Sequence, residues 1–154
     1  MKKYIALLLV LCTALGLAAC AGTAEEPLEL NLEQIYAAMD NATDETMTPI
    51  NPGWLLDMYG IIPEDCEEAY VYSYNSGIMA AEIWLIKATS AEALSRLKTL
   101  AESRLAALDA QSASYSPEMN KVVKKAQIIT RGNYLAMILS TNVEDLAAIF
   151  NNAG

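Results

Sequence analysis

Two apolar stretches joined by a short turn constrain the fold of this chain most. Residues 68–74 and 78–88 are rich in β-branched and aromatic side chains, and Asn75-Ser76-Gly77 between them is typical of a tight turn. This pattern predicts a β-hairpin. Side chains alternate between the two faces of a strand, and in the second stretch both sets are largely apolar. We therefore expect the second strand to lie at the centre of its sheet.

A long helix should follow this hairpin directly. Thr89-Ser90-Ala91-Glu92 has the spacing of a capping box, and leucines and alanines then recur at helical intervals. These features predict an amphipathic helix over residues 90–111. We expect a loop over residues 112–116 and then a short helical turn over residues 117–125, opened by Pro117.

A second strand-strand-helix unit ends the chain. Residues 126–131 and 134–140 predict a hairpin around the turn Gly132-Asn133. Thr141-Asn142-Val143-Glu144 is another capping box, so a final helix should follow it. Its inward side chains are predicted to be Leu146, Ile149 and Phe150.

Two further helices are predicted before the first hairpin. Asn31 is a suitable N-cap for a helix from Leu32 to about residue 41. Asn51 and Pro52 indicate the start of a second, short helix that ends at Gly60. Its expected apolar face consists of Trp54, Leu55, Met58 and Tyr59.

The predicted element order is α-α-β-β-α-β-β-α. Such an order is typical of an α+β domain with two layers, in which helices pack against a four-stranded, mainly antiparallel sheet. We place this single domain at residues 30–154.

The N-terminal residues have a different character. Residues 1–19 combine a basic start, an apolar run and small residues, which is the pattern of a secretory signal peptide. The stretch Leu17-Ala18-Ala19-Cys20 resembles the bacterial lipobox, and this resemblance implies a diacylglyceryl group on Cys20 and cleavage before it. Residues 20–29 would then be the lipidated cysteine and a flexible tether. We therefore expect an extracytoplasmic protein anchored to the outer face of the cytoplasmic membrane; the alternative is an ordinary signal peptide with a chance cysteine.

Short motifs across residues 30–150 are similar to those of a family of small uncharacterised bacterial lipoproteins. This resemblance implies lipidation and an extracytoplasmic α+β domain, and it carries no catalytic residues. The motifs are Tyr59-Gly60-Ile61, Pro63-Glu64-Asp65, Ala81-Glu82-Ile83, Ile86-Lys87, Arg104-Leu105, Tyr115-Ser116-Pro117-Glu118 and Gly132-Asn133-Tyr134.

The charges are unevenly distributed along the chain. Between Cys20 and Ile86 the sequence has thirteen carboxylates and no Lys or Arg. Loss of Lys2 and Lys3 with the leader would change the formal charge from -9 to -11. Nucleic acids and anionic lipid surfaces both favour basic proteins, so we expect no nucleic-acid partner.

Several catalytic chemistries are excluded by composition. The chain has no histidine, which rules out Ser-His and Cys-His catalysis and disfavours a zinc site. Cys66 would be the single thiol of the mature chain, and we expect it to be buried as a small apolar residue. Two acidic clusters, over residues 40–45 and 64–68, raise the possibility of calcium binding, but neither has the ligand spacing of an EF-hand. We expect no metal and no cofactor besides the covalent lipid on Cys20.

Two features of the first hairpin are candidates for binding. Tyr70, Tyr72 and Tyr74 alternate onto one face, where they form either a recognition surface or packing beneath a helix. Glu82 lies among apolar residues in mid-strand, so it is either an ion-pair partner of Lys87 or Arg104 or a polar group in a ligand pocket. We therefore expect a non-enzymatic binding or accessory module that recognises an envelope protein or a small ligand. The alternative is a cell-wall glycan hydrolase with two carboxylates about 5 to 9.5 Å apart.

Overall fold

The computed structural model describes residues 28–76 and 79–154 of the chain. Within these residues, five strands form one antiparallel sheet in the order β1-β2-β3-β5-β4. The strands are β1 (Thr48–Pro49), β2 (Cys66–Ser76), β3 (Met79–Ala88), β4 (Gln127–Arg131) and β5 (Tyr134–Leu139). The predicted α+β class is confirmed, whereas the prediction of four strands is wrong. The missed strand, β1, has two residues, too few to show the alternation by which a strand is recognised.

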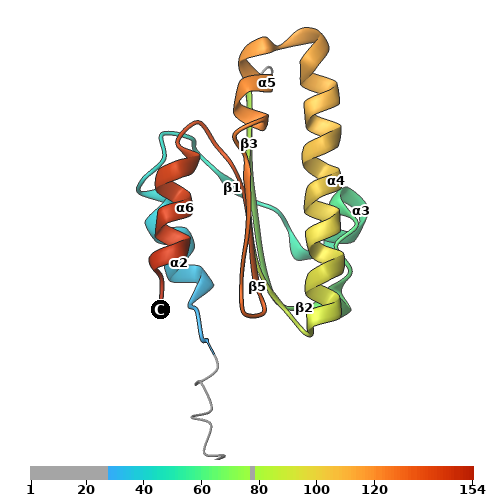
Figure 1. Cartoon of the computed structure of the whole chain (residues 1–154), viewed down its shortest axis with the longest axis vertical. Coiled ribbons are helices and arrows are strands. Elements are labelled where there is room, and N and C mark those ends of the chain that lie inside the picture. Colours follow the sequence, from blue (N-terminus) through green and yellow to red (C-terminus); the bar gives the residue numbers. More distant parts are fainter. Residues whose placement is uncertain (1–27, 77–78) are drawn as a thin grey trace, which may run out of the picture.

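Helices cover both faces of the sheet (Figure 1). Helices α2 and α6 lie on one side, and α3 and α4 lie on the other. The predicted two-layer arrangement is therefore wrong, because the described residues form three layers. The helices are α2 (Leu32–Asp40), α3 (Leu55–Tyr59), α4 (Ala91–Tyr115), α5 (Pro117–Val123) and α6 (Val143–Asn152), and the 3-10 turns are η1 (Pro52–Trp54) and η2 (Pro63–Asp65).

Strand β3 occupies the centre of the sheet, as predicted. Ile83 and Leu85 contribute to the core under α2 and α6, whereas Trp84 and Ile86 contribute to the core under α3 and α4. All four side chains are fully buried. Burial of a side chain of this size stabilises the fold by about 1.5–3 kcal/mol, so an apolar strand of this kind requires a layer of helices on each side.

Helix α4 is longer than predicted. Ser90 is its N-cap, and its Oγ accepts a hydrogen bond from the backbone N–H of Ala93 at 3.1 Å. At the other end the predicted loop over residues 112–116 is wrong, since α4 continues to Tyr115. The buried hydroxyl of Ser112 donates to the Leu108 carbonyl at 2.7 Å, so this serine is accommodated inside the helix rather than ending it.

Helix α6 begins one residue later than the capping box predicts. Asn142 occupies the N-cap position, and its side chain makes no capping hydrogen bond. Thr141 instead donates from its backbone N–H and its hydroxyl to Glu45 Oε1, at 3.0 and 3.1 Å. Leu146 and Phe150 are buried as predicted, and Ile149 is partly buried against the same core.

Some predictions fall on residues that the structure does not describe. The signal peptide, Cys20 and most of the tether belong to residues 1–27, and Gly77 and Ile78 of the first turn are also outside the described residues. The turn between β4 and β5 is present, with Gly132 at φ 54°, where glycine is strongly favoured. In residues 28–76 and 79–154, none of the helices combines the length and the apolar character that a membrane crossing needs.

Candidate functional site

The short helix α3 carries large apolar side chains that face solvent. Asn51 Oδ1 accepts a hydrogen bond from the Gly53 N–H at 2.9 Å and starts the preceding 3-10 turn, and Gly60 ends α3 at φ 74°. The predicted inward face is only half correct: Leu55 is buried and Tyr59 is partly buried, in line with the prediction. Trp54 and Met58, in contrast, are 61% and 52% exposed, and Leu56 beside them is 50% exposed.

A hollow of about 320 Å³ lies at the end of α3, where Gly60 contributes to its lining. Ile62, which is 41% exposed, and Leu100 of α4 form apolar parts of its wall. Gly60, Asp65, Ser95, Arg96 and Thr99 complete the lining. We name the exposed side chains of Trp54, Leu56, Met58 and Ile62, together with this hollow, the α3 surface.

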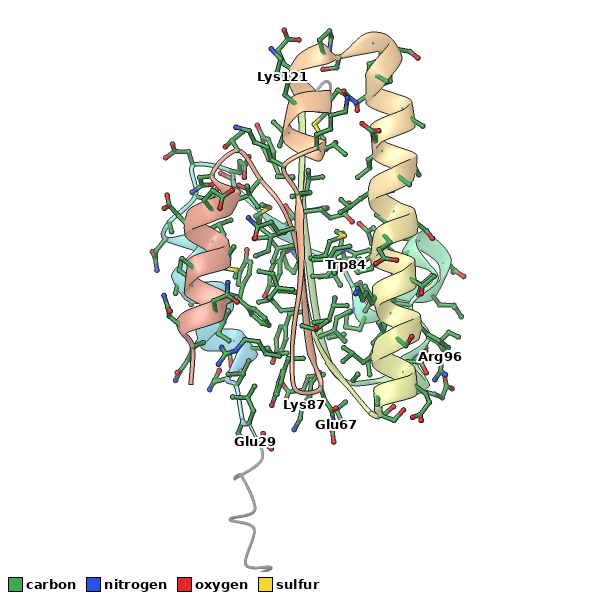
Figure 2. All side chains as sticks on the ribbon, in the orientation of Figure 1. Glu29, Glu67, Trp84, Lys87, Arg96 and Lys121 are labelled. Carbon is green, nitrogen blue, oxygen red and sulfur yellow. The ribbon has the colours of Figure 1, made fainter. Side chains whose placement is uncertain are left out.

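An ion pair fixes one wall of the hollow. Arg96 donates from Nε and Nη2 to the two carboxylate oxygens of Asp65, at 3.0 and 2.5 Å. These hydrogen bonds hold the pKa of Asp65 below its ordinary value. The Asp65 carboxylate is buried, whereas more than half of the Arg96 side chain is exposed and extends outward from α4 (Figure 2).

Two carboxylates near the α3 surface have no cationic partner. Asp57 lies in α3 and Glu64 in η2, and both are exposed. Neither forms an ion pair with any cation in the described part of the chain. Two unpaired carboxylates therefore lie in the same stretch of chain as the exposed apolar side chains.

The three tyrosines predicted as a binding surface are half-buried on the opposite face of the sheet. They pack against the core under α2 and α6. Tyr72 stacks on Tyr36 of α2, with the ring centroids 3.3 Å apart and the planes 5° from parallel. Burial raises the pKa of Tyr72. Tyr70 also lines a separate hollow, and Tyr74 packs against the same core.

Glu82 is placed inside the layer between β3 and α4. Its side chain is 4% exposed and accepts hydrogen bonds from Trp84 Nε1 at 2.8 Å and Arg104 Nη2 at 2.7 Å. Of the two predicted partners, Arg104 is the one observed. Lys87 pairs instead with Glu67 and Glu29 at the end of the sheet near the first described residues (Figure 2).

A second hollow, of about 410 Å³, is lined by acidic residues and Tyr70. Its carboxylates are Glu29, Glu33 and Glu68. Hydrogen bonds from Lys87 and from the Tyr134 hydroxyl lower the pKa of Glu29. A glycoside hydrolase needs a carboxylic acid with a raised pKa to protonate the leaving group, so the shift at Glu29 is opposite to that requirement.

Several carboxylates of the acidic clusters raised as calcium candidates are engaged in other contacts, among them Glu45, Asp65 and Glu67. Glu45 accepts hydrogen bonds from Thr43, Ser140 and Thr141, and it joins the loop after α2 to the end of β5. Within residues 28–76 and 79–154, no three acidic or cysteine side chains gather as a metal site would require. Cys66 is partly buried rather than fully buried, and burial raises the pKa of its thiol to about 11.

Comparison with known proteins adds one match. The family model of a domain of unknown function, DUF4358, matches residues 39–140, which is more than half of the chain. The matched region contains the whole α3 surface and the Glu82–Arg104 pair. Neither a curated protein nor a solved structure matches the chain.

Proposed function

Because the chain belongs to the DUF4358 family, a domain of unknown function, we propose its role from its own surface. The protein is a lipid-anchored, extracytoplasmic binding module that holds another envelope protein through the α3 surface. The observation that carries this proposal is the exposure of four large apolar side chains within nine consecutive residues, 54–62.

This exposure is concentrated in one place. Among the described residues, five large apolar side chains are strongly exposed, and four of them belong to the α3 surface. The fifth, Tyr115, is at the end of α4, near the Ser116 cap of α5. Scattered apolar residues are normal on a protein surface, but several within one short segment are typical of an interaction site. Trp and Met are, moreover, enriched at the centres of protein interfaces.

Two observations favour a binding role over catalysis: the absence of histidine, and the structural contacts that occupy Glu82. Without histidine, the common nucleophile-base pairs are excluded. Glu82, the most buried carboxylate of the first hairpin, is fully occupied by Trp84 and Arg104. We therefore propose binding rather than catalysis.

The lipobox-like stretch supports the anchor. A diacylglyceryl group on Cys20 would place two acyl chains on one sulfur, and two chains are needed for stable attachment. Seven residues lie between Cys20 and Leu28, where the described residues begin, so the distance from Cys20 to Leu28 is at most about 28 Å. Replacement of Cys20 by Ala should release the protein from the membrane fraction into the soluble fraction. A variant that stays in the membrane would contradict the anchor.

The binding role is tested by native electrophoresis of the full chain after extraction in an uncharged detergent. The wild-type protein should migrate in an assembly larger than itself. The double variant Trp54→Ser, Met58→Ser should migrate alone, whereas the control Tyr115→Ser should keep the assembly. If the double variant keeps the assembly too, the α3 surface is not the binding site.

A further inference from the structure

Resting on this proposed function, we infer that the partner presents a cationic amphipathic segment to the α3 surface. Apolar side chains of that segment cover Trp54, Leu56 and Met58. One apolar side chain of the segment enters the hollow beside Leu100. Lysine or arginine side chains on the flanks of the segment pair with Asp57 and Glu64.

Charge is the first argument for this partner. Asp57 and Glu64 are exposed and lack a cation of their own among the described residues. They belong to a stretch of the sequence, from Cys20 to Ile86, that has thirteen carboxylates and no basic residue. Complementary charge at an interface rim guides association and excludes partners of like charge. Unpaired carboxylates beside exposed apolar side chains thus favour a partner that presents both apolar and cationic side chains.

The shape of the surface is the second argument. The hollow of about 320 Å³ is at the lower end of the range for small-molecule pockets, and Ile62, one of the four exposed apolar side chains, contributes to its lining. A helical segment is suited to such a surface, because one of its side chains can fill the hollow while others at helical spacing cover the exposed apolar side chains. The Arg96–Asp65 pair holds the wall of the hollow in place before binding.

The same observations disfavour a bilayer and a second copy as the occupant. Helices that lie on membranes usually have Lys or Arg on their polar face, whereas α3 has Asp57 and no basic residue. A symmetric pair of these chains would bring the unpaired carboxylates of the two copies together, which costs interaction energy. A separate protein with basic side chains beside its apolar ones avoids both problems.

The test uses the full chain in an uncharged detergent and three synthetic peptides without tryptophan. One peptide is a helical Leu/Lys repeat, the second a matched Leu/Glu repeat and the third a Ser/Lys repeat without an apolar face. The readout is acrylamide quenching, which reports on the exposed Trp54 because the second tryptophan, Trp84, is buried. We expect the Leu/Lys peptide to protect Trp54 and the other two peptides to leave its quenching unchanged.

Matched charge variants distinguish specific pairing with Asp57 and Glu64 from general attraction of a cationic peptide to an acidic protein. The double variant Asp57→Lys, Glu64→Lys should weaken Leu/Lys binding about tenfold. The double variant Glu118→Lys, Glu144→Lys makes the same change in net charge in α5 and α6 and should weaken it less than about twofold. Equal losses in the two variants, or equal binding of the Leu/Glu peptide, would overturn the inference.

Vesicles decide between a protein and a lipid occupant. If phosphatidylcholine or phosphatidylglycerol vesicles alone protect Trp54, the α3 surface contacts the bilayer and the inference is wrong. The peptide test can fail while the assembly still depends on Trp54 and Met58. That combination would reject a cationic amphipathic partner but leave the proposed function in place.

Discussion

Arg104 of α4 and Glu82 of β3 form an ion pair in the layer between helix and sheet, with Arg104 Nη2 2.7 Å from Glu82 Oε2. Arg104 Nε adds two longer contacts, each of 3.2 Å, to the same carboxylate. The guanidinium also lies over the ring of Tyr59, 5.3 Å from its centroid. This pair links the end of α3, the middle of α4 and the central strand.

Loss of the Glu82 charge should destabilise the domain, because Arg104 would keep a partly buried positive charge without its partner. We expect Glu82→Gln to lower the free energy of unfolding by about 3 kcal/mol in urea denaturation. Replacement of both residues, as Glu82→Leu with Arg104→Leu, should recover most of that loss, since it leaves no unpaired charge. If Glu82→Gln cost less than about 1 kcal/mol and abolished partner binding, Glu82 would belong to a ligand site instead.

The stacked pair of Tyr36 and Tyr72 should contribute to the packing of α2 on the sheet. Aromatic pairs of this kind add about 0.5–1.5 kcal/mol beyond the burial of their area. A double-mutant cycle with Tyr36→Leu and Tyr72→Leu should therefore give a coupling free energy of about 1 kcal/mol. Tyr115→Leu, at an exposed site, should change the free energy of unfolding by less than about 0.5 kcal/mol. Zero coupling between the two tyrosines would contradict the stacked geometry.

The Asp65–Arg96 pair should make stability depend on pH in the acidic range. The pKa of Asp65 is lowered in the folded protein, so its contribution is present above the pKa of an unfolded aspartate, about 3.9. That contribution is lost as the pH falls through the folded-state pKa. The difference in unfolding free energy between wild type and Asp65→Asn should thus be largest near pH 7 and shrink steadily below pH 4. A difference that stays constant down to pH 2 would contradict this assignment.

Cys66 should react slowly with alkylating reagents. Burial, together with the nearby charge of Asp65, raises the pKa of its thiol to about 11, so little thiolate is present at neutral pH. At pH 8 we expect iodoacetamide to modify the folded protein roughly a hundredfold more slowly than a free cysteine of pKa about 8.5. Mass spectrometry should show the rate rising about tenfold per pH unit up to about pH 10. A rate that levels off near pH 9 would show that the thiol is not shielded.

Much of the fold could be predicted because local sequence and tertiary packing agree. The apolar faces of β3 indicated its central position, and Asn31 and Ser90 are observed as caps. The prediction of two layers did not use this observation fully. A strand that is apolar on both faces needs helices on both sides of its sheet, which gives three layers. The short strand β1 could not be predicted, because its pairing with β2 is set by long-range packing.

The candidate site was harder to predict than the fold. Residues 54–59 are nearly all apolar, so helical periodicity does not show which of them face the core. The packing of Leu55 under α4 determines the inward face. For the tyrosines of β2, alternation shows only that they share one face of the strand. It does not show that α2 covers that face, so their packing role could not be predicted. The partner of Glu82 was among the two predicted residues, because Arg104 is long enough to reach the sheet from a helix above it.

Cross-linking in living cells tests the binding role of the α3 surface most directly. A photo-reactive amino acid replaces Leu56 in one variant and Tyr115 in another. Both residues are exposed; Leu56 belongs to α3, and Tyr115 is the last residue of α4. The proposed function predicts one recurrent protein adduct at Leu56, absent at Tyr115 and lost when Met58→Ser is added. No protein adduct at Leu56, or the same adducts at both positions, would contradict it.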